Sequence, residues 1–140
     1  MIEISNTTKR KLPTNSLRKA IKEVLKQEKH RAEMISAVYC GDKFIKKINR
    51  TFLQHNDATD TISFRLNEGE SVEGEFYISL DTVSRNARQY KVSEEEELLR
   101  VTIHSVLHLV GYNDETEPQR KKMTEKENAC LATFTRRKKS

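Results

Sequence analysis

The 140-residue chain has little of what breaks or cross-links a polypeptide, with two prolines, four glycines, two cysteines and no tryptophan. Because such residues are few and no low-complexity linker divides the chain, we expect a single domain over residues 1–140. Cys40 and Cys130 lie far apart and lack the short spacing of metal-binding or redox cysteines. We predict two buried, reduced thiols rather than a disulfide.

Long apolar runs are also missing. No stretch approaches the roughly 20 residues of a membrane span, and the first thirty residues contain no apolar signal-peptide core. These absences predict a soluble, cytoplasmic protein. Hydrophobic residues (35%) and charged residues (34%) are nearly equal in number, but the apolar residues recur periodically, which favours a folded globule over disorder.

The charge is unevenly distributed. Residues 1–50 carry a net charge of +8, residues 51–114 carry −7 and residues 115–140 carry +4, for a total of +5. A positive total is compatible with a polyanionic partner without identifying one. The basic flanks can supply phosphate contacts, although solvated helix faces explain them equally well.

Hydrophobic periodicity predicts alternating strands and helices, followed by a hairpin and a run of helices. The predicted strands are residues 2–4, 33–40, 60–66 and 75–80, and the predicted helices begin near Ser16, Asp42, Asp81, Glu94 and Thr116. Ser16, Asp42 and Asp81 are expected to cap the helices that they begin. Ser93 and Glu96 match a capping box for the next helix.

The fold class expected from this order is α+β, with a mixed sheet of about four strands packed with about five helices. Residues 98–110 are apolar on nearly every side, which predicts a buried central helix. Residues 67–74 are predicted to form an exposed hairpin loop, Tyr90 to contribute to a buried helix face, and the basic residues 135–140 to fray.

The predicted central helix carries His104 and His108. Residues four apart lie on one helical face with Cβ atoms about 5–6 Å apart, so their imidazoles can converge on one metal ion. Gly111 can take the left-handed conformation that ends a helix, and Asp114 can then return beside the histidines. Two imidazoles and a carboxylate are typical of catalytic zinc, leaving a position for a water that loses its proton near pH 7.

The spacing is similar to the extended zinc-protease signature, in which Glu follows the first histidine as general base. Ser105 occupies that position here, which disfavours peptide hydrolysis. A single histidine on an apolar face is commonly a hydrogen-bonded core residue, but the second histidine, the glycine and the carboxylate together favour a metal site.

Residues 104–114 (H-S-V-L-H-L-V-G-Y-N-D) resemble the metal motif of the YbeY family, H-G-x-L-H-L-x-G-Y-D-H. Residues 59–64 (T-D-T-I-S-F) resemble its T-D-V-L-S-F strand, and residues 74–79 (G-E-F-Y-I-S) resemble its G-D-I-x-I-S strand. The resemblance covers most of the chain and is most specific over residues 49–114. It implies an rRNA maturation factor, namely a metal-dependent endoribonuclease that is specific for single strands and processes the 3′ end of small-subunit rRNA. Zinc is the expected metal, and ribosomal RNA and the small ribosomal subunit are the expected partners.

Three positions depart from the family pattern. Asp114 stands where the family has a third histidine; a carboxylate can still bind zinc but lowers the charge of the site. Ser105 replaces a glycine. Leu53 stands where the family commonly has a basic residue credited with a role in activity, and His55 is the nearest side chain that can substitute for it.

We therefore expect zinc held by His104, His108 and Asp114 to activate water for attack on a phosphodiester, with residues 59–64 forming the opposite wall of a cleft. No general base is identifiable from the sequence. The candidates for substrate contact are His55, Asp60 and Ser63, each of which also has an ordinary structural explanation.

Two other functions stay open. One is a ribosome-associated or rRNA-associated binding factor whose metal is structural, which the Leu53 departure favours. The other is a metal-dependent hydrolase of a small ester, amide or peptide, which the missing Glu disfavours. A fourth protein ligand closing the metal site would count against any hydrolytic function.

Overall fold

The computed structural model describes the backbone of residues 1–53 and 60–139, and the side chains of residues 1–51 and 60–134. Its elements, in chain order, are β1 (Ile2–Asn6), α1 (Thr14–Gln27), β2 (Arg31–Cys40), α2 (Asp42–Leu53), β3 (Thr61–Arg65), β4 (Ser71–Ser79), α3 (Leu80–Tyr90), α4 (Glu94–Leu109) and α5 (Glu117–Lys139). Within the described residues, five helices and a four-stranded mixed sheet confirm the predicted α+β class.

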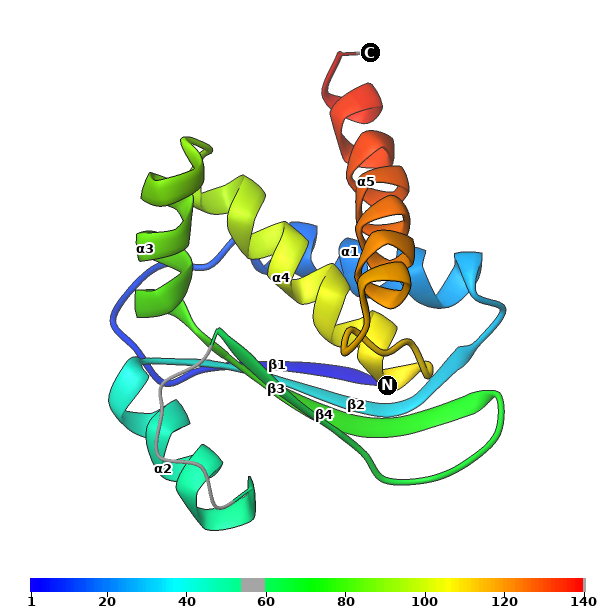
Figure 1. The fold of residues 1–140 in the computed structure, drawn as a ribbon, viewed down its shortest axis with the longest axis horizontal. Coiled ribbons are helices and arrows are strands. Elements are labelled where there is room, and N and C mark those ends of the chain that lie inside the picture. Colours follow the sequence, from blue (N-terminus) through cyan, green and yellow to red (C-terminus); the bar gives the residue numbers. More distant parts are fainter. Residues whose placement is uncertain (54–59, 140) are drawn as a thin grey trace.

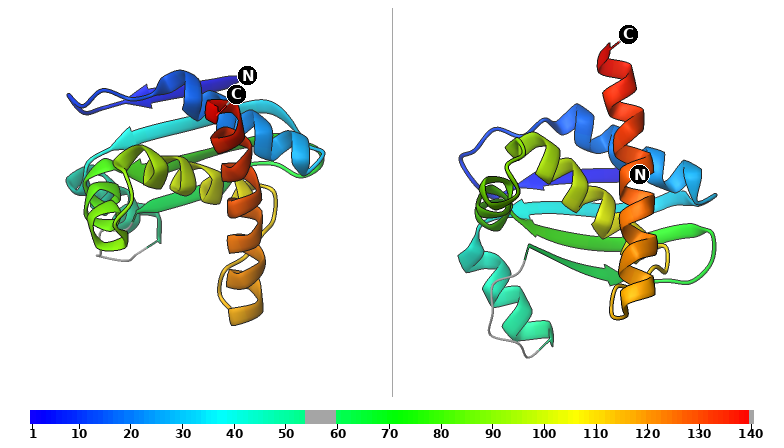
Figure 2. Two further views of the ribbon diagram at one scale, coloured as in Figure 1. Left: turned by 90° about the horizontal axis from the view of Figure 1, so that it is seen from above. Right: turned by 45° about the horizontal axis from the view of Figure 1, so that its top comes forward.

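The strands form one sheet in the order β1-β2-β4-β3. β2 runs parallel to both of its neighbours, β1 and β4, and β3 runs antiparallel to β4. Helices α1 and α4 lie over one face of the sheet, and α2 lies under the other (Figure 1). Helix α5 stands beside the C-terminal end of α4 and rises away from the sheet (Figure 2).

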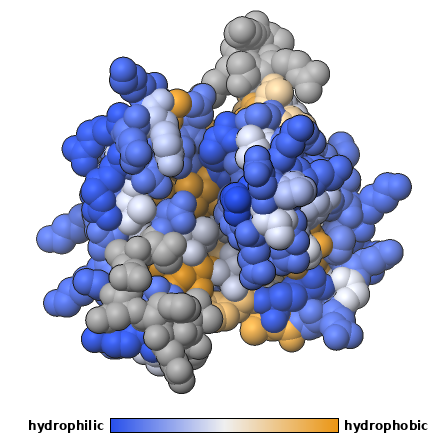
Figure 3. All heavy atoms as spheres, viewed as in Figure 1, coloured by the Kyte–Doolittle hydropathy of each residue, from blue (hydrophilic) through white to orange (hydrophobic). Residues whose placement is uncertain are grey.

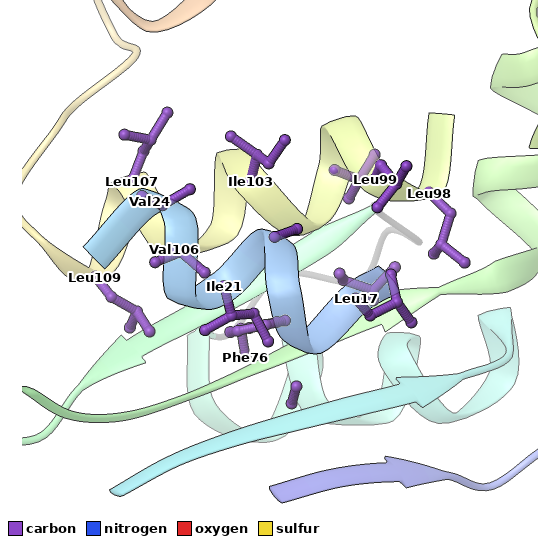
Figure 4. Close-up of a cluster of buried hydrophobic side chains, with 14 of the residues drawn as sticks. Leu17, Ile21, Val24, Phe76, Leu98, Leu99, Ile103, Val106, Leu107 and Leu109 are labelled. Carbon is purple, nitrogen blue, oxygen red and sulfur yellow. The ribbon is translucent and has the colours of Figure 1, made fainter. Parts of the chain in front are cut away.

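The main core lies between the sheet and the pair α1 and α4. Leu17 and Ile21 of α1, Phe76 of β4, and Ile103 and Val106 of α4 meet there (Figure 4). All five are fully buried, and burying a side chain of this kind contributes about 1.5–3 kcal/mol. Because α4 contacts α1, α3, α5, β3 and β4, it is the buried central helix that the sequence predicts.

A smaller cluster lies between α2 and the sheet, where Cys40, Ile45 and Ile62 pack together. Cys40 and Cys130 are both buried thiols that are not joined in a disulfide, as predicted. Burial, reinforced by two nearby aspartates, raises the pKa of the Cys40 thiol to about 11. The thiol is therefore protonated and unreactive near neutral pH.

Helices α2 and α3 begin side by side, because β2 and β4 are parallel neighbours with Cys40 paired to Ser79. This arrangement makes the predicted caps wrong. Asp42 lies inside α2, and its backbone N–H donates to the Asp81 carboxylate at 2.9 Å. Ser79, not Asp81, caps α3 by accepting from the Thr82 N–H at 3.3 Å. The Asp42 carboxylate in turn accepts from the Ser79 and Thr82 hydroxyls, so each aspartate serves the neighbouring helix start.

The other helix starts differ in how well the sequence predicts them. Helix α1 begins before the expected Ser16, directly after Pro13, and no side chain caps it. Ser93 caps α4 as predicted, accepting from the backbone N–H three residues on at 3.0 Å. Thr116 and Gln119 form a reciprocal box at the start of α5, with the Gln119 N–H donating to the Thr116 hydroxyl and the Thr116 N–H donating to the Gln119 side chain.

Strand β4 is longer than predicted. It begins at Ser71, which shortens the expected loop of residues 67–74 to residues 66–70. Gly74 therefore lies in the sheet, where a Cβ atom would be 2.9 Å from Cδ2 of Leu109. The glycine permits the close approach of α4 to the sheet rather than a turn.

The ends of α3 and α5 concern two further predictions, the burial of Tyr90 and the fraying of the basic tail. Tyr90 is 59% exposed because α3 ends at this residue, so the prediction that it is buried is wrong. Helix α5 extends to Lys139, but the side chains of residues 135–139 lie outside the described residues, and the predicted fraying of that tail stays a prediction. None of the described helices combines the length and apolar character needed to cross a membrane.

Candidate metal centre

The chain reverses at the end of α4. Gly111 has a φ of 105°, in the left-handed region that glycine adopts without steric cost. The Tyr112 N–H donates to the Leu107 carbonyl at 3.0 Å, and the Gly111 N–H donates to the His108 carbonyl at 3.1 Å. This turn, which the sequence predicts, brings Asp114 back beside the helix.

The three predicted ligands converge on one point. The Nε2 atoms of His104 and His108 are 3.1 Å apart, and Oδ2 of Asp114 is 3.3 Å from each of them. This group of side chains can hold a metal ion. Among the side chains that the structure describes, no fourth histidine, cysteine, aspartate or glutamate joins the group.

The second nitrogen of each imidazole fixes its orientation. Nδ1 of His108 lies 3.0 Å from the Tyr112 carbonyl oxygen, and Nδ1 of His104 lies 2.7 Å from Oε2 of Glu127. Both neighbours are acceptors, so each Nδ1 carries a proton and each neutral ring has its lone pair on Nε2. Three lone-pair atoms then face one another at close range and repel unless a cation lies among them. The donor set therefore fits a divalent metal ion.

Glu127 of α5 is the contributor that sequence reasoning missed. Its side chain is buried, holds His104 through one oxygen and accepts from Arg100 through the other at 2.9 Å. A carboxylate behind a metal-binding imidazole fixes the ring and raises its basicity. The signal in the sequence is weak: Glu127 lies on the apolar stripe of α5, between buried Met123 and Cys130.

The electrostatics of the site favour positive charge. Burial of His104 opposes its charged form, but the hydrogen bond and charge of Glu127, with the charges of Asp114 and Asp60, outweigh burial and raise the pKa of His104. A metal ion competes with that proton for the same nitrogen, so metal binding and deprotonation of His104 are coupled.

The group opens into a cleft of about 670 Å³. The lining includes Asn49 of α2, residues of β3 and the residues that follow α4. Of the predicted substrate contacts, Asp60 and Ser63 line this cleft, whereas His55 lies outside the described residues. On the face shown in Figure 3, side chains on the outer surface are largely hydrophilic, and apolar residues are visible in the furrow between α3 and α5.

Strand β3 is fastened to α4 through Ser105. The Ser105 hydroxyl donates to the Val101 carbonyl at 2.7 Å and lies 2.7 Å from Oγ1 of Thr61. The Ser63 hydroxyl donates to the Ser105 carbonyl at 3.3 Å. These bonds hold the two walls of the cleft together, so Ser63 has a structural partner as well as a place in the cleft. A glycine in place of Ser105 would lack the contact with Thr61.

Arg65, to which the sequence reasoning assigns no role, brings a positive charge to the cleft. Its guanidinium donates to the carbonyl oxygens of Leu109 and Gly69, both at 2.7 Å, and to the side chain of Asn67 at 2.9 Å. The contact with Leu109 sets a cation against the C-terminal end of α4, where free carbonyls favour it.

Known proteins resemble the whole chain. A family model described as Endoribonuclease YbeY matches residues 3–135. A protein of that name from Chloroherpeton thalassium is 61% identical over 133 residues, which cover 95% of this chain and 94% of the relative. Another, from Chlorobium phaeovibrioides, is 52% identical over 130 residues, covering 93% and 88%. The solution structure of TM1509 from Thermotoga maritima is similar over 98% of this chain and 93% of its own, with a TM-score of 0.67 and 28% identity.

The family match extends from β1 into α5 and includes every side chain of the metal group, including Glu127 behind it. It confirms the resemblance that the sequence motifs indicate. The chain therefore belongs to the YbeY family of endoribonucleases, and by that membership it is an enzyme of the nuclease class, a hydrolase.

Proposed function

We propose that this protein is a zinc-dependent endoribonuclease, specific for single-stranded RNA, that acts in the cytoplasm in maturation of the 3′ end of small-subunit rRNA. Its partners would be ribosomal RNA and the small ribosomal subunit. The family membership supports RNA as the substrate. The observation that carries the catalytic proposal is the convergence of three acceptor atoms in the wall of an open cleft.

His104, His108 and Asp114 are the proposed metal ligands. A zinc ion bound by them would act as a Lewis acid toward water and toward a phosphodiester oxygen. Glu127 and the Tyr112 carbonyl hold the two imidazoles so that both Nε2 atoms face the cleft. The absence of a fourth ligand among the described side chains supports a catalytic site over a closed structural one.

The substrate contacts are proposed on the β3 side of the cleft. Asp60 and Ser63 line the same cleft as the metal group, and both present oxygen atoms that can accept from ribose hydroxyls. Arg65 also lines the cleft and would place a positive charge beside a phosphate bound there. His55 is kept as a further proposed contact on the sequence argument alone.

The proposal is tested by measuring bound metal and cleavage of single-stranded RNA for the wild type, a chelated sample and His108→Ala. We expect about one equivalent of zinc in the wild type and loss of both metal and cleavage in the other two. Glu115→Gln is the matched control for metal content, because Glu115 lines the cleft without joining the metal group. A duplex RNA of the same sequence tests strand specificity and should resist cleavage.

Each alternative predicts a distinct result. Stoichiometric metal with rRNA binding but no cleavage would replace the proposal with a binding factor whose metal is structural. Cleavage that survives both chelation and His108→Ala would show that the metal group is not the catalyst. Metal-dependent hydrolysis of small esters or amides, with RNA left intact, would establish the small-molecule hydrolase instead.

A further inference from the structure

A second pocket, of about 630 Å³, lies where α1 packs over the edge strand β1. Four basic side chains line it: Arg18, Lys22, Lys26 and His30. Among the side chains that the structure describes, no acidic one lines it. The pocket is thus about as large as the cleft that holds the three proposed metal ligands, here called the metal cleft. Its lining is basic, whereas the lining of the metal cleft includes carboxylates.

Within the described part of the chain, no carboxylate is paired with either of the two lysines of this pocket. Lys22 and Lys26 are exposed, and neither forms an ion pair with a described carboxylate. The side chains of the acidic residues closest in sequence have other partners. Glu23 accepts from the Gln27 side chain at 3.1 Å. The Glu28 carboxylate accepts from the Tyr112 hydroxyl and pairs with Lys126, both outside the pocket, while its backbone carbonyl lies 2.8 Å from Nδ1 of His30 in the pocket.

The rest of the pocket consists of one held guanidinium and an apolar lining. Nη1 of Arg18 donates to the Ile2 carbonyl of β1 at 2.6 Å, which fixes the guanidinium at the pocket. A guanidinium carries five N–H donors, and among the described residues this is the bond that Arg18 forms. Ile2, Leu25 and Ala32 supply an apolar lining. An aliphatic surface beside separated cations can pack against a sugar or base while the cations contact the phosphates.

The pocket is linked structurally to the rim of the metal cleft. Glu28 follows directly after α1, and its Oε1 accepts from the Tyr112 hydroxyl at 2.6 Å. Its Oε2 lies 3.1 Å from Nζ of Lys126 on α5. Tyr112 itself lines the metal cleft. The C-terminal end of α1 is therefore held against one side of the cleft.

We propose that the pocket between α1 and β1 binds the phosphodiester backbone of single-stranded RNA, holding a part of the strand that continues beyond the metal cleft. This inference rests on the proposed function for the identity of the polyanion. Lys22 and Lys26 are the principal phosphate contacts, Arg18 is a third, and the apolar lining takes the sugar or base. The cleft supplies the chemistry, and the pocket supplies much of the salt-sensitive affinity.

The test compares Lys22→Ala/Lys26→Ala with the wild type, using chelated protein and a single-stranded RNA long enough to extend beyond the cleft. For single strands, each phosphate contact contributes about −0.7 to the slope of log affinity against log salt concentration. Losing two contacts should therefore make this slope less negative by about 1.4. Lys9→Ala/Lys11→Ala is the matched control. It removes two exposed charges from the loop before α1 and should leave the slope unchanged.

Cleavage kinetics provide the second readout in metal-loaded protein. The double variant should raise KM for the long RNA while leaving kcat, and cleavage of an oligonucleotide short enough to fill only the cleft, unchanged. Lys22→Arg/Lys26→Arg should restore the wild-type KM, and equal melting temperatures show that the variants are folded. If the metal-loaded wild type cleaves no RNA, the proposed function fails, but the salt slopes still decide the role of the pocket.

One result would overturn the inference while leaving the proposed function intact: a salt slope in Lys22→Ala/Lys26→Ala equal to that of the wild type and of the control variant. If that variant also loses binding to vesicles of anionic phospholipid, the pocket is a headgroup site instead.

Discussion

Asp42 and Asp114 are both partly exposed carboxylates, with side chains 29% and 41% accessible, but their surroundings differ. Asp42 accepts from two hydroxyls at 2.6 and 2.7 Å and pairs with Arg85 at 2.7 Å. Asp114 faces two imidazole nitrogens that are themselves acceptors when the rings are neutral. The first carboxylate is satisfied by the fold, whereas the second is satisfied only when a cation or a proton joins it.

The comparison separates carboxylates that stabilise the protein from those that can bind a ligand. A carboxylate surrounded by donors contributes to folding, and a carboxylate surrounded by acceptors costs stability until its site is filled. Substitutions at the two positions should therefore affect different measurements.

The largest effect is expected for Asp114→Asn. Removing a ligand should lower the affinity for zinc by more than the roughly 10–100-fold that is typical of losing a supporting residue. The unfolding free energy of the metal-free protein should change by less than about 0.5 kcal/mol. Competition titration with a chelating dye and urea denaturation measure the two quantities. A large loss of stability in the metal-free protein would show that Asp114 stabilises the fold, and would contradict the distinction drawn between Asp42 and Asp114.

A somewhat smaller effect is expected for Glu127→Gln. The amide can still accept from Nδ1 of His104, but the charge that raises the basicity of the ring is lost, so zinc affinity should fall by about 10–100-fold. The same titration measures it. Glu125→Gln, an exposed neighbour on α5, is the control and should retain wild-type affinity. Equal zinc affinities for the two variants would show that Glu127 does not support metal binding.

Asp42→Asn should show the opposite pattern to Asp114→Asn. Loss of its charge-assisted hydrogen bonds should cost about 1–3 kcal/mol of stability at neutral pH, with metal affinity unchanged. Urea denaturation and the same dye titration test both parts. A loss of zinc affinity as large as that of Asp114→Asn would refute the distinction between the two carboxylates.

Asp42 also predicts how the stability of the protein depends on pH in the acid range. Burial alone would raise the pKa of Asp42, but hydrogen bonds from Ser79, Thr82 and Arg85, with the arginine charge, lower it below the ordinary 3.8. A lowered folded pKa gives stabilisation that is fully present above pH 3.8 and is lost as the pH falls through the folded value. The stability difference between wild type and Asp42→Asn should therefore shrink on acidification below pH 3.8. A difference that stays constant would contradict this.

The smallest effect is expected for Tyr112→Phe. The side chain loses one hydrogen bond to Glu28, worth about 0.5–1.5 kcal/mol, while the backbone carbonyl that orients His108 is retained. Stability should fall slightly in thermal denaturation, and zinc affinity should be unchanged. Tyr90→Phe is the control at an exposed tyrosine. A drop in zinc affinity would mean that the contact with α1 also shapes the metal centre.

The convergence of the three proposed metal ligands was predictable because their geometry is local. His104 and His108 share a face of one helix by virtue of their spacing, and the φ of Gly111 returns Asp114 within a few residues. Glu127 was not predictable in the same way, since it approaches His104 from a different helix. A charged residue on an apolar stripe indicates that some partner exists, but not which one.

The same contrast explains the errors in the helix caps. Ser93 accepts from a backbone N–H of its own helix, and its role was predicted. Asp42 and Asp81 act on neighbouring helices, because the parallel pairing of β2 and β4 sets the two helix starts together. Pairing between strands that are distant in the chain leaves no local pattern in either aspartate.

The sequence by itself determined the α+β class, the buried helix with its two imidazoles, and the family, because periodicity, i to i+4 spacing and motif identity are all properties of short segments. Only the tertiary structure decided that Glu127 orients His104, that Ser105 fastens the walls of the cleft, and that four basic side chains surround a pocket at the edge of the sheet. These depend on contacts between elements far apart in the chain, where packing of the whole core, rather than local preference, sets which side chains meet.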